Sequence, residues 1–66
     1  MNKTRRAALI NKLNIINEKI INTKNFLLEE NDDQELIVFF ELDLILYTNT
    51  KVMIEKALIN NHIEEL

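Results

Sequence analysis

Residues 36–47 have the sequence LIVFFELDLILY, in which ten of twelve residues are apolar or aromatic. This stretch is the expected core of the chain. Asp43 is its anomaly, because an ionised carboxylate among apolar side chains loses hydration. On a helix its neighbours three and four positions away are Phe39, Phe40, Leu46 and Tyr47. A carboxylate in these surroundings is a candidate functional residue.

Length and composition limit the possible classes of protein. The chain has 66 residues and no cysteine. It is short enough to be a single domain, residues 1–66, that leaves much apolar surface uncovered when it folds alone. Neither a disulfide nor a thiolate metal site can stabilise it. No apolar run approaches the roughly twenty residues that span a bilayer, and no signal-peptide pattern follows the basic N-terminus. We therefore expect a soluble, cytoplasmic protein.

The first half of the chain has the pattern of a helix. Gly and Pro are absent, and turns between strands usually use one or the other, so the composition favours helices throughout. Apolar residues recur at alternating spacings of four and three, which is typical of a helix that packs along one seam. The predicted seam consists of Leu9, Leu13, Ile16, Ile20, Thr23 and Leu27. It predicts a helix over about residues 3–29.

A turn and a second helix are predicted to follow. Residues 30–33, Glu-Asn-Asp-Asp, are the only cluster of turn-forming residues between two apolar periodic segments. The second helix is expected over about residues 33–62. Its predicted seam consists of Val38, Leu42, Ile45, Asn49, Val52, Lys56, Ile59 and Ile63. A β-strand is the competing interpretation of residues 36–40, which are rich in β-branched and aromatic side chains. The seam that continues beyond them favours the helix.

Charge is divided between the two halves. Residues 1–28 carry six Lys or Arg and one Glu, whereas residues 29–66 carry ten acidic residues and two Lys. The helices should therefore attract each other, which together with the short turn predicts an all-α, antiparallel two-helix hairpin. The same attraction explains the basic N-terminus. The formal net charge of −3 argues against a nucleic-acid partner.

The second helix is apolar almost all round between residues 36 and 47. If Val38, Leu42 and Ile45 face the first helix, a second apolar line stays outside. This line consists of Phe40, Leu44 and Tyr47. Since exposed apolar patches mark interfaces, we predict a homodimer in which two hairpins form a four-helix bundle. The alternative is that another protein uses this surface.

Common catalytic and metal-binding motifs are absent from the sequence. It contains no Ser-His-Asp or Cys-His arrangement, no glycine for a phosphate loop, no HExxH and no calcium loop. The one histidine, His62, falls near the C-terminus and is interpreted as part of a frayed turn. We expect the chain to have no cofactor or metal of its own.

A family resemblance centres on Glu41-Leu42-Asp43. The arrangement resembles the small sporulation stage-zero E-like aspartyl-phosphate phosphatases of spore-forming bacilli, which are two-helix hairpins marked by S-Q-E-L-D early in the second helix. The similarity spans roughly Leu13 to Tyr47. It comprises Ile-Asn-Glu-Lys at 16–19, Leu-Leu-Glu-Glu at 27–30, and Glu-Leu-Asp at 41–43 followed by apolar residues and Tyr47. Phe39 and Phe40 stand where the motif has Ser and Gln, and the glycine common in the family's turn is absent.

The resemblance implies a negative regulator of sporulation that removes the aspartyl phosphate of a response regulator. Asp43 would be the catalytic residue, which positions water or stabilises charge beside a metal ion held by the partner's receiver domain. The resemblance assigns partner binding to Phe39, Phe40, Glu41, Leu44 and Tyr47. The alternative is a non-enzymatic helical interaction module, such as a small antagonist, an antitoxin or a phage-encoded adaptor.

Overall fold

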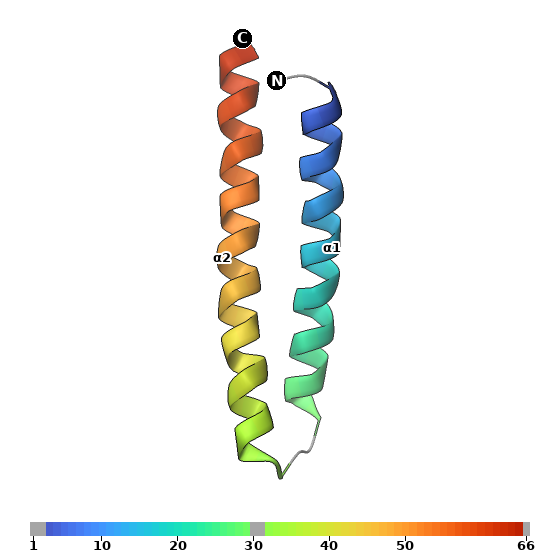
Figure 1. Cartoon of the computed structure of the whole chain (residues 1–66), viewed down its shortest axis with the longest axis vertical. Coiled ribbons are helices and arrows are strands. Elements are labelled where there is room, and N and C mark those ends of the chain that lie inside the picture. Colours follow the sequence, from blue (N-terminus) through green and yellow to red (C-terminus); the bar gives the residue numbers. More distant parts are fainter. Residues whose placement is uncertain (1–2, 30–31, 66) are drawn as a thin grey trace.

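The computed structural model describes residues 3–29 and 32–65, and the side chains of residues 3–29 and 32–60. Two helices make up the fold, α1 (Lys3–Leu28) and α2 (Gln34–Glu65). They lie side by side and antiparallel (Figure 1), and the molecule measures 51 × 15 × 13 Å. The predicted all-α hairpin is confirmed. The strand interpretation of residues 36–40 is wrong, because this segment lies within α2.

The start of α2 is determined by Asp33. Its side-chain Oδ1 accepts a hydrogen bond of 3.0 Å from the backbone N–H of Leu36, and its carbonyl oxygen accepts one of 3.0 Å from Ile37. These bonds satisfy N–H groups at the open end of the helix, as an N-cap residue does. Glu35 in the first turn adds negative charge where the helix dipole favours it. Asp33 therefore fixes where α2 begins.

The predicted seam of α1 is confirmed. Ile16 and Ile20 are buried, and the other apolar members of the seam are partly buried. Thr23 is only 6% exposed, and its hydroxyl donates a hydrogen bond of 2.7 Å to the carbonyl oxygen of Lys19. The one polar side chain in the seam therefore has a partner, as a buried hydroxyl requires.

The predicted seam of α2 is wrong. Val38, Leu42 and Ile45 are each at least half exposed. Against α1 lies another line with the same spacing of three and four, whose members are buried or half-buried. It consists of Ile37, Phe40, Leu44, Tyr47, Lys51, Ile54 and Leu58. The line of Phe40, Leu44 and Tyr47, which was expected outside, thus packs against α1 and is not free to form the predicted dimer contact.

The polar residues of the predicted and the observed seam of α2 explain why the observed one faces α1. The predicted seam would press Asn49 and Lys56 against α1, whereas the observed seam contains Lys51 as its only polar member. Each unpaired polar group taken out of water costs free energy, so the observed line is the better face. It also stacks the rings of Phe40 and Phe26, with 3.8 Å between centroids.

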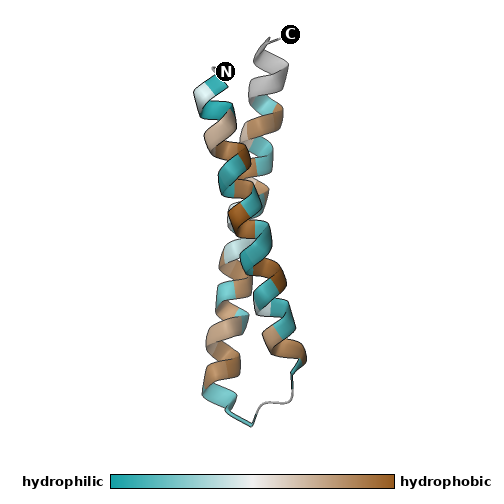
Figure 2. Cartoon of the chain, turned by 90° about the vertical axis from the view of Figure 1, so that its right-hand side faces the viewer, coloured by the Kyte–Doolittle hydropathy of each residue, from teal (hydrophilic) through white to brown (hydrophobic). Residues whose placement is uncertain are grey.

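Hydropathy is distributed differently on the two helices. Figure 2 shows hydrophilic and hydrophobic residues alternating along α1, while the first half of α2 is hydrophobic with few interruptions. The core between them is small, with Ile16, Ile20 and Ile54 as the buried apolar residues of the described chain. No described helix is both long and apolar enough to cross a membrane.

Candidate functional site

Asp43 lies at the edge of the contact between the two helices. At about 100° per residue, it stands on α2 between the packed side chains of Phe40 and Tyr47 and the exposed side chains of Phe39 and Leu46. It is half-buried. Within the described part of the chain, no hydrogen bond or ion pair engages its carboxylate, and no buried side-chain oxygen lacks a partner. The carboxylate oxygens are therefore open to solvent.

Exposed apolar side chains lie around Asp43 on one side of α2. They occur seven and four residues before it and three residues after it, positions that share one side of a helix. These residues are Leu36 (37% exposed), Phe39 (55%) and Leu46 (60%). We call Asp43 together with these three residues the Asp43 face. It presents an acidic group in the middle of an apolar surface, which is an arrangement suited to binding another protein around one polar contact.

A shallow hollow adjoins the Asp43 face at the start of α2. Its volume is about 230 Å³, and it is lined by Asp33, Glu35, Leu36 and Phe39. Leu36 and Phe39 belong to both the hollow and the Asp43 face. The hollow combines carboxylates with an aromatic ring, so its chemistry suits a basic side chain of a partner.

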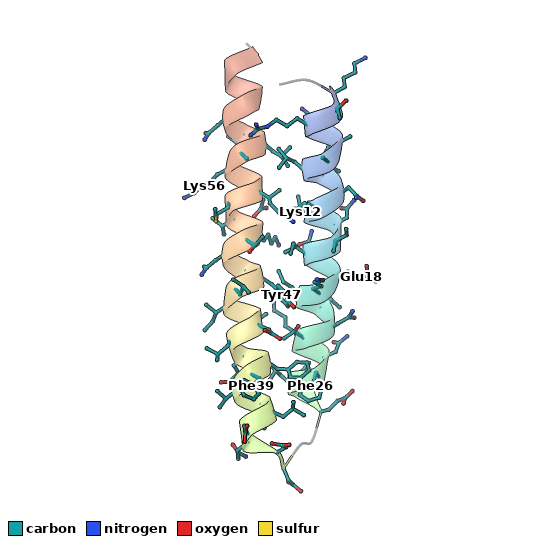
Figure 3. The ribbon with its side chains drawn as sticks, viewed as in Figure 1. Lys12, Glu18, Phe26, Phe39, Tyr47 and Lys56 are labelled. Carbon is teal, nitrogen blue, oxygen red and sulfur yellow. The ribbon has the colours of Figure 1, made fainter. Side chains whose placement is uncertain are left out.

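The other site residues suggested by the sequence do not gather around Asp43. Phe40 stacks on Phe26, while Leu44 and Tyr47 pack against the buried core. The ammonium group of Lys19 lies 5.6 Å from the ring centroid of Tyr47, and Figure 3 shows Tyr47 between the helices. These aromatic and apolar residues hold the hairpin together. Of the residues expected to contact a partner, Phe39 is the apolar one that lies exposed beside Asp43.

Glu41 lies on a different side of α2. It is exposed, and two residues along a helix turn the side-chain direction by about 160° from Asp43, measured the short way round. The two carboxylates of the Glu-Leu-Asp tripeptide therefore do not converge. A partner that contacts Asp43 closely meets Phe39 and Leu46 before it meets Glu41.

Leu36 and Leu46 were missing from the site that the sequence predicted. The sequence shows that both residues lie on the same side of a helix as Asp43. It does not show whether they are exposed, and exposure decides whether they belong to a binding surface or to the core. Among the described residues, no group of three or more His, Cys, Asp or Glu is arranged to hold a metal ion. The side chain of His62 lies outside the described part of the chain.

Comparisons with protein-family models, with curated proteins and with solved structures found no match for this chain. The class of this protein is therefore described from its fold and its candidate site. It is a two-helix hairpin whose second helix carries an accessible carboxylate within an exposed apolar surface.

Proposed function

We propose that this chain is a small regulator that docks on the receiver domain of a response regulator and promotes hydrolysis of its aspartyl phosphate. The main support for this proposal is Asp43, which is half-buried but accessible and has the exposed side chains of Leu36, Phe39 and Leu46 beside it. The resemblance at residues 41–43 supplies the reaction and the partner, a sporulation response regulator that this protein would inhibit. A receiver partner would also place the chain in the cytoplasm.

The proposed reaction needs little from the hairpin. The receiver domain supplies the phosphorylated aspartate and the bound metal ion, so the chain needs no cofactor of its own. Asp43 would accept a hydrogen bond from a water molecule and hold it in line with the bond to be broken. The water oxygen bonds to phosphorus as the bond from phosphorus to the receiver's carboxylate oxygen breaks. Inorganic phosphate leaves, the receiver regains its carboxylate, and the proton of the water passes to Asp43 or to solvent.

Binding would come from the apolar part of the Asp43 face. Phe39 supplies an aromatic ring at the position closest to the turn, and Leu46 extends the surface toward the middle of α2. Aromatic and aliphatic side chains around one polar group give both affinity and orientation at interfaces. Phe40, Leu44 and Tyr47 would contribute indirectly, because they hold α2 against α1 in the orientation that presents Asp43.

The test is to mix the purified chain with a phosphorylated sporulation-type response regulator and to follow the loss of phosphate. We expect Asp43→Ala to abolish the acceleration while helicity and receiver binding stay close to those of the unchanged protein. Glu18→Ala is the matched control, since Glu18 is an exposed carboxylate on α1 that points away from α2 (Figure 3). Full activity of Asp43→Ala would exclude the assignment of Asp43.

A second candidate function is a non-enzymatic interaction module that binds a partner without chemistry. The observation that favours it is that large apolar side chains of α2 are exposed well beyond the Asp43 face, among them Leu42, Ile45 and Met53. In the same experiment, this function predicts stable receiver binding with no change in the rate of phosphate loss. We also propose that two copies of the chain associate into an assembly of four helices. The contact between the copies must use residues other than Phe40, Leu44 and Tyr47, because these three pack against α1.

A further inference from the structure

The side of α2 that faces away from α1 carries a line of apolar residues with two polar residues among them. Its apolar members are between 43% and 60% exposed. We call this line the outer stripe; it consists of Val38, Leu42, Ile45, Val52 and Ile59, with Asn49 and Lys56 at the intervening positions. At 3.6 residues per turn its centre lies about 140° around the helix from the centre of the seam. The chain's own α1 therefore cannot cover it.

The outer stripe has the dimensions of a helix-binding surface. From Val38 to Ile59 it runs for about 32 Å at 1.5 Å per residue. A contiguous exposed apolar surface of a few hundred Å² marks an interaction site on a small protein. The spacing of three and four along the stripe is that of a helix packing against another helix. We propose that a second copy of this chain covers the outer stripe, with the two α2 helices packed antiparallel about a two-fold axis.

The position of the axis follows from the length of the stripe. An antiparallel pair covers the whole stripe of both copies only if the axis passes near its midpoint, which falls next to Asn49. Asn49 is exposed in the single chain. Near the axis, Asn49 of one copy meets Asn49 of the other, and the two amides can each donate and accept a hydrogen bond. A polar residue at such a position fixes the register of a helix pair.

Charge favours the antiparallel over the parallel direction. Lys56 is the only charged residue on the outer stripe, and Figure 3 shows its side chain directed away from α1. A parallel pair would place Lys56 of one copy on Lys56 of the other. The antiparallel pair instead brings Lys56 within about one helical turn of Glu41 of the other copy, where opposite charges attract. Glu41 is exposed and flanks the stripe.

This dimer differs in shape from a closed four-helix bundle. In a closed four-helix bundle, the two faces by which a helix contacts its neighbours lie about 90° apart around its axis. Here the two packed faces of α2 lie about 140° apart. The two α2 helices therefore lie in the middle and the two α1 helices outside, in an open row. Asp43 lies about 150° around α2 from the stripe and stays accessible. This dimer assigns a surface to the self-association proposed above. It does not involve Asp43, so the dimer and the removal of phosphate can fail separately.

Sedimentation equilibrium at micromolar concentration tests this proposal. The chain has a mass of 7.8 kDa, and we expect twice that mass for the unchanged protein. Ile45→Glu on the outer stripe should return the mass to that of one chain. The matched control is Ile21→Glu on α1, because Ile21 is 57% exposed but lies off the stripe; this variant should remain a dimer. A monomeric unchanged protein, or an Ile45→Glu variant that stays dimeric, would overturn the proposal.

A charge exchange tests the antiparallel direction. Lys56→Glu should weaken the dimer by about tenfold in dissociation constant, since each dimer contains two contacts between Lys56 and Glu41. Adding Glu41→Lys to the same chain should restore the dimer. Circular dichroism of each variant checks that the hairpin is folded. A dimer that Lys56→Glu weakens and Glu41→Lys does not restore would exclude the antiparallel arrangement.

Discussion

Two isoleucines of α2 provide a direct test of which side of this helix faces α1. Ile54 lies in the observed seam and is 6% exposed, whereas Ile45 lies on the outer stripe and is 60% exposed. Replacing either by alanine removes the same atoms and gives the same gain in helix propensity, so the difference between the variants reports burial alone. The prediction is that Ile54→Ala is much the more damaging change in a dilute, monomeric sample.

The expected magnitudes follow from the two exposures. Replacement of a buried isoleucine by alanine costs about 2–5 kcal/mol, because the lost transfer free energy is joined by the cost of a cavity. Ile45 buries less than half of its surface and leaves no cavity, so we expect a cost of about 1 kcal/mol or less. A domain of this size has a stability of about 3–10 kcal/mol in total. Ile54→Ala should therefore remove a large share of the stability, and Ile45→Ala only a small share.

Urea denaturation followed by far-ultraviolet circular dichroism measures both costs. The measurement needs two protein concentrations, because a dimer gains stability with concentration and Ile45→Ala weakens the proposed dimer. The gap between Ile45→Ala and the unchanged protein should widen at high concentration, whereas the cost of Ile54→Ala should be large at both. If Ile45→Ala costs as much as Ile54→Ala in the dilute sample, then α2 is turned the other way and the seam described above is incorrect.

Two further predictions concern residues that hold the hairpin. Phe40→Ala should cost about 2–3 kcal/mol, because it removes a half-buried ring that stacks on Phe26. Phe39→Ala, the exposed neighbour, should cost much less, and thermal denaturation compares them. Equal costs would contradict the observed packing. Asp33→Ala should cost about 1 kcal/mol by removing the oxygen that caps α2, with Asp32→Ala as the control in the same urea titration. A larger loss from Asp32→Ala would show that the cap lies elsewhere.

The sequence predicts the two helices well and their contact only in part. The acidic residues before α2, the absence of Gly and Pro, and the seam of α1 each indicate helices, and the structure contains α1 and α2. In α2, two apolar lines have the same spacing, so periodicity cannot tell the line around Ile54 from the line around Ile45. What separates them is the energy of burying Asn49 and Lys56 rather than Lys51, which depends on the tertiary contact.

The candidate site shows the same limit. Asp43 was identified from its apolar neighbours, and those neighbours are where a helix puts them. Which of them are exposed depends on how α2 is turned about its own axis. Phe39 and Leu46 line the open side of Asp43, while Phe40 and Tyr47 pack against α1. A local sequence pattern does not predict how α2 is rotated about its own axis relative to α1.

The two apolar sides of α2 give the native fold a close competitor, which is the same hairpin with α2 turned about its axis by about 140°. In that arrangement Val38, Leu42 and Ile45 would meet α1, and the connectivity of the chain would be unchanged. Asn49 and Lys56 oppose the turned state because it would take them out of water, and the stacking of Phe40 on Phe26 favours the native one. Replacing both by leucine would remove this polar penalty and bring the two packings closer in free energy. A polar residue that contributes nothing to the core can thus decide which core forms.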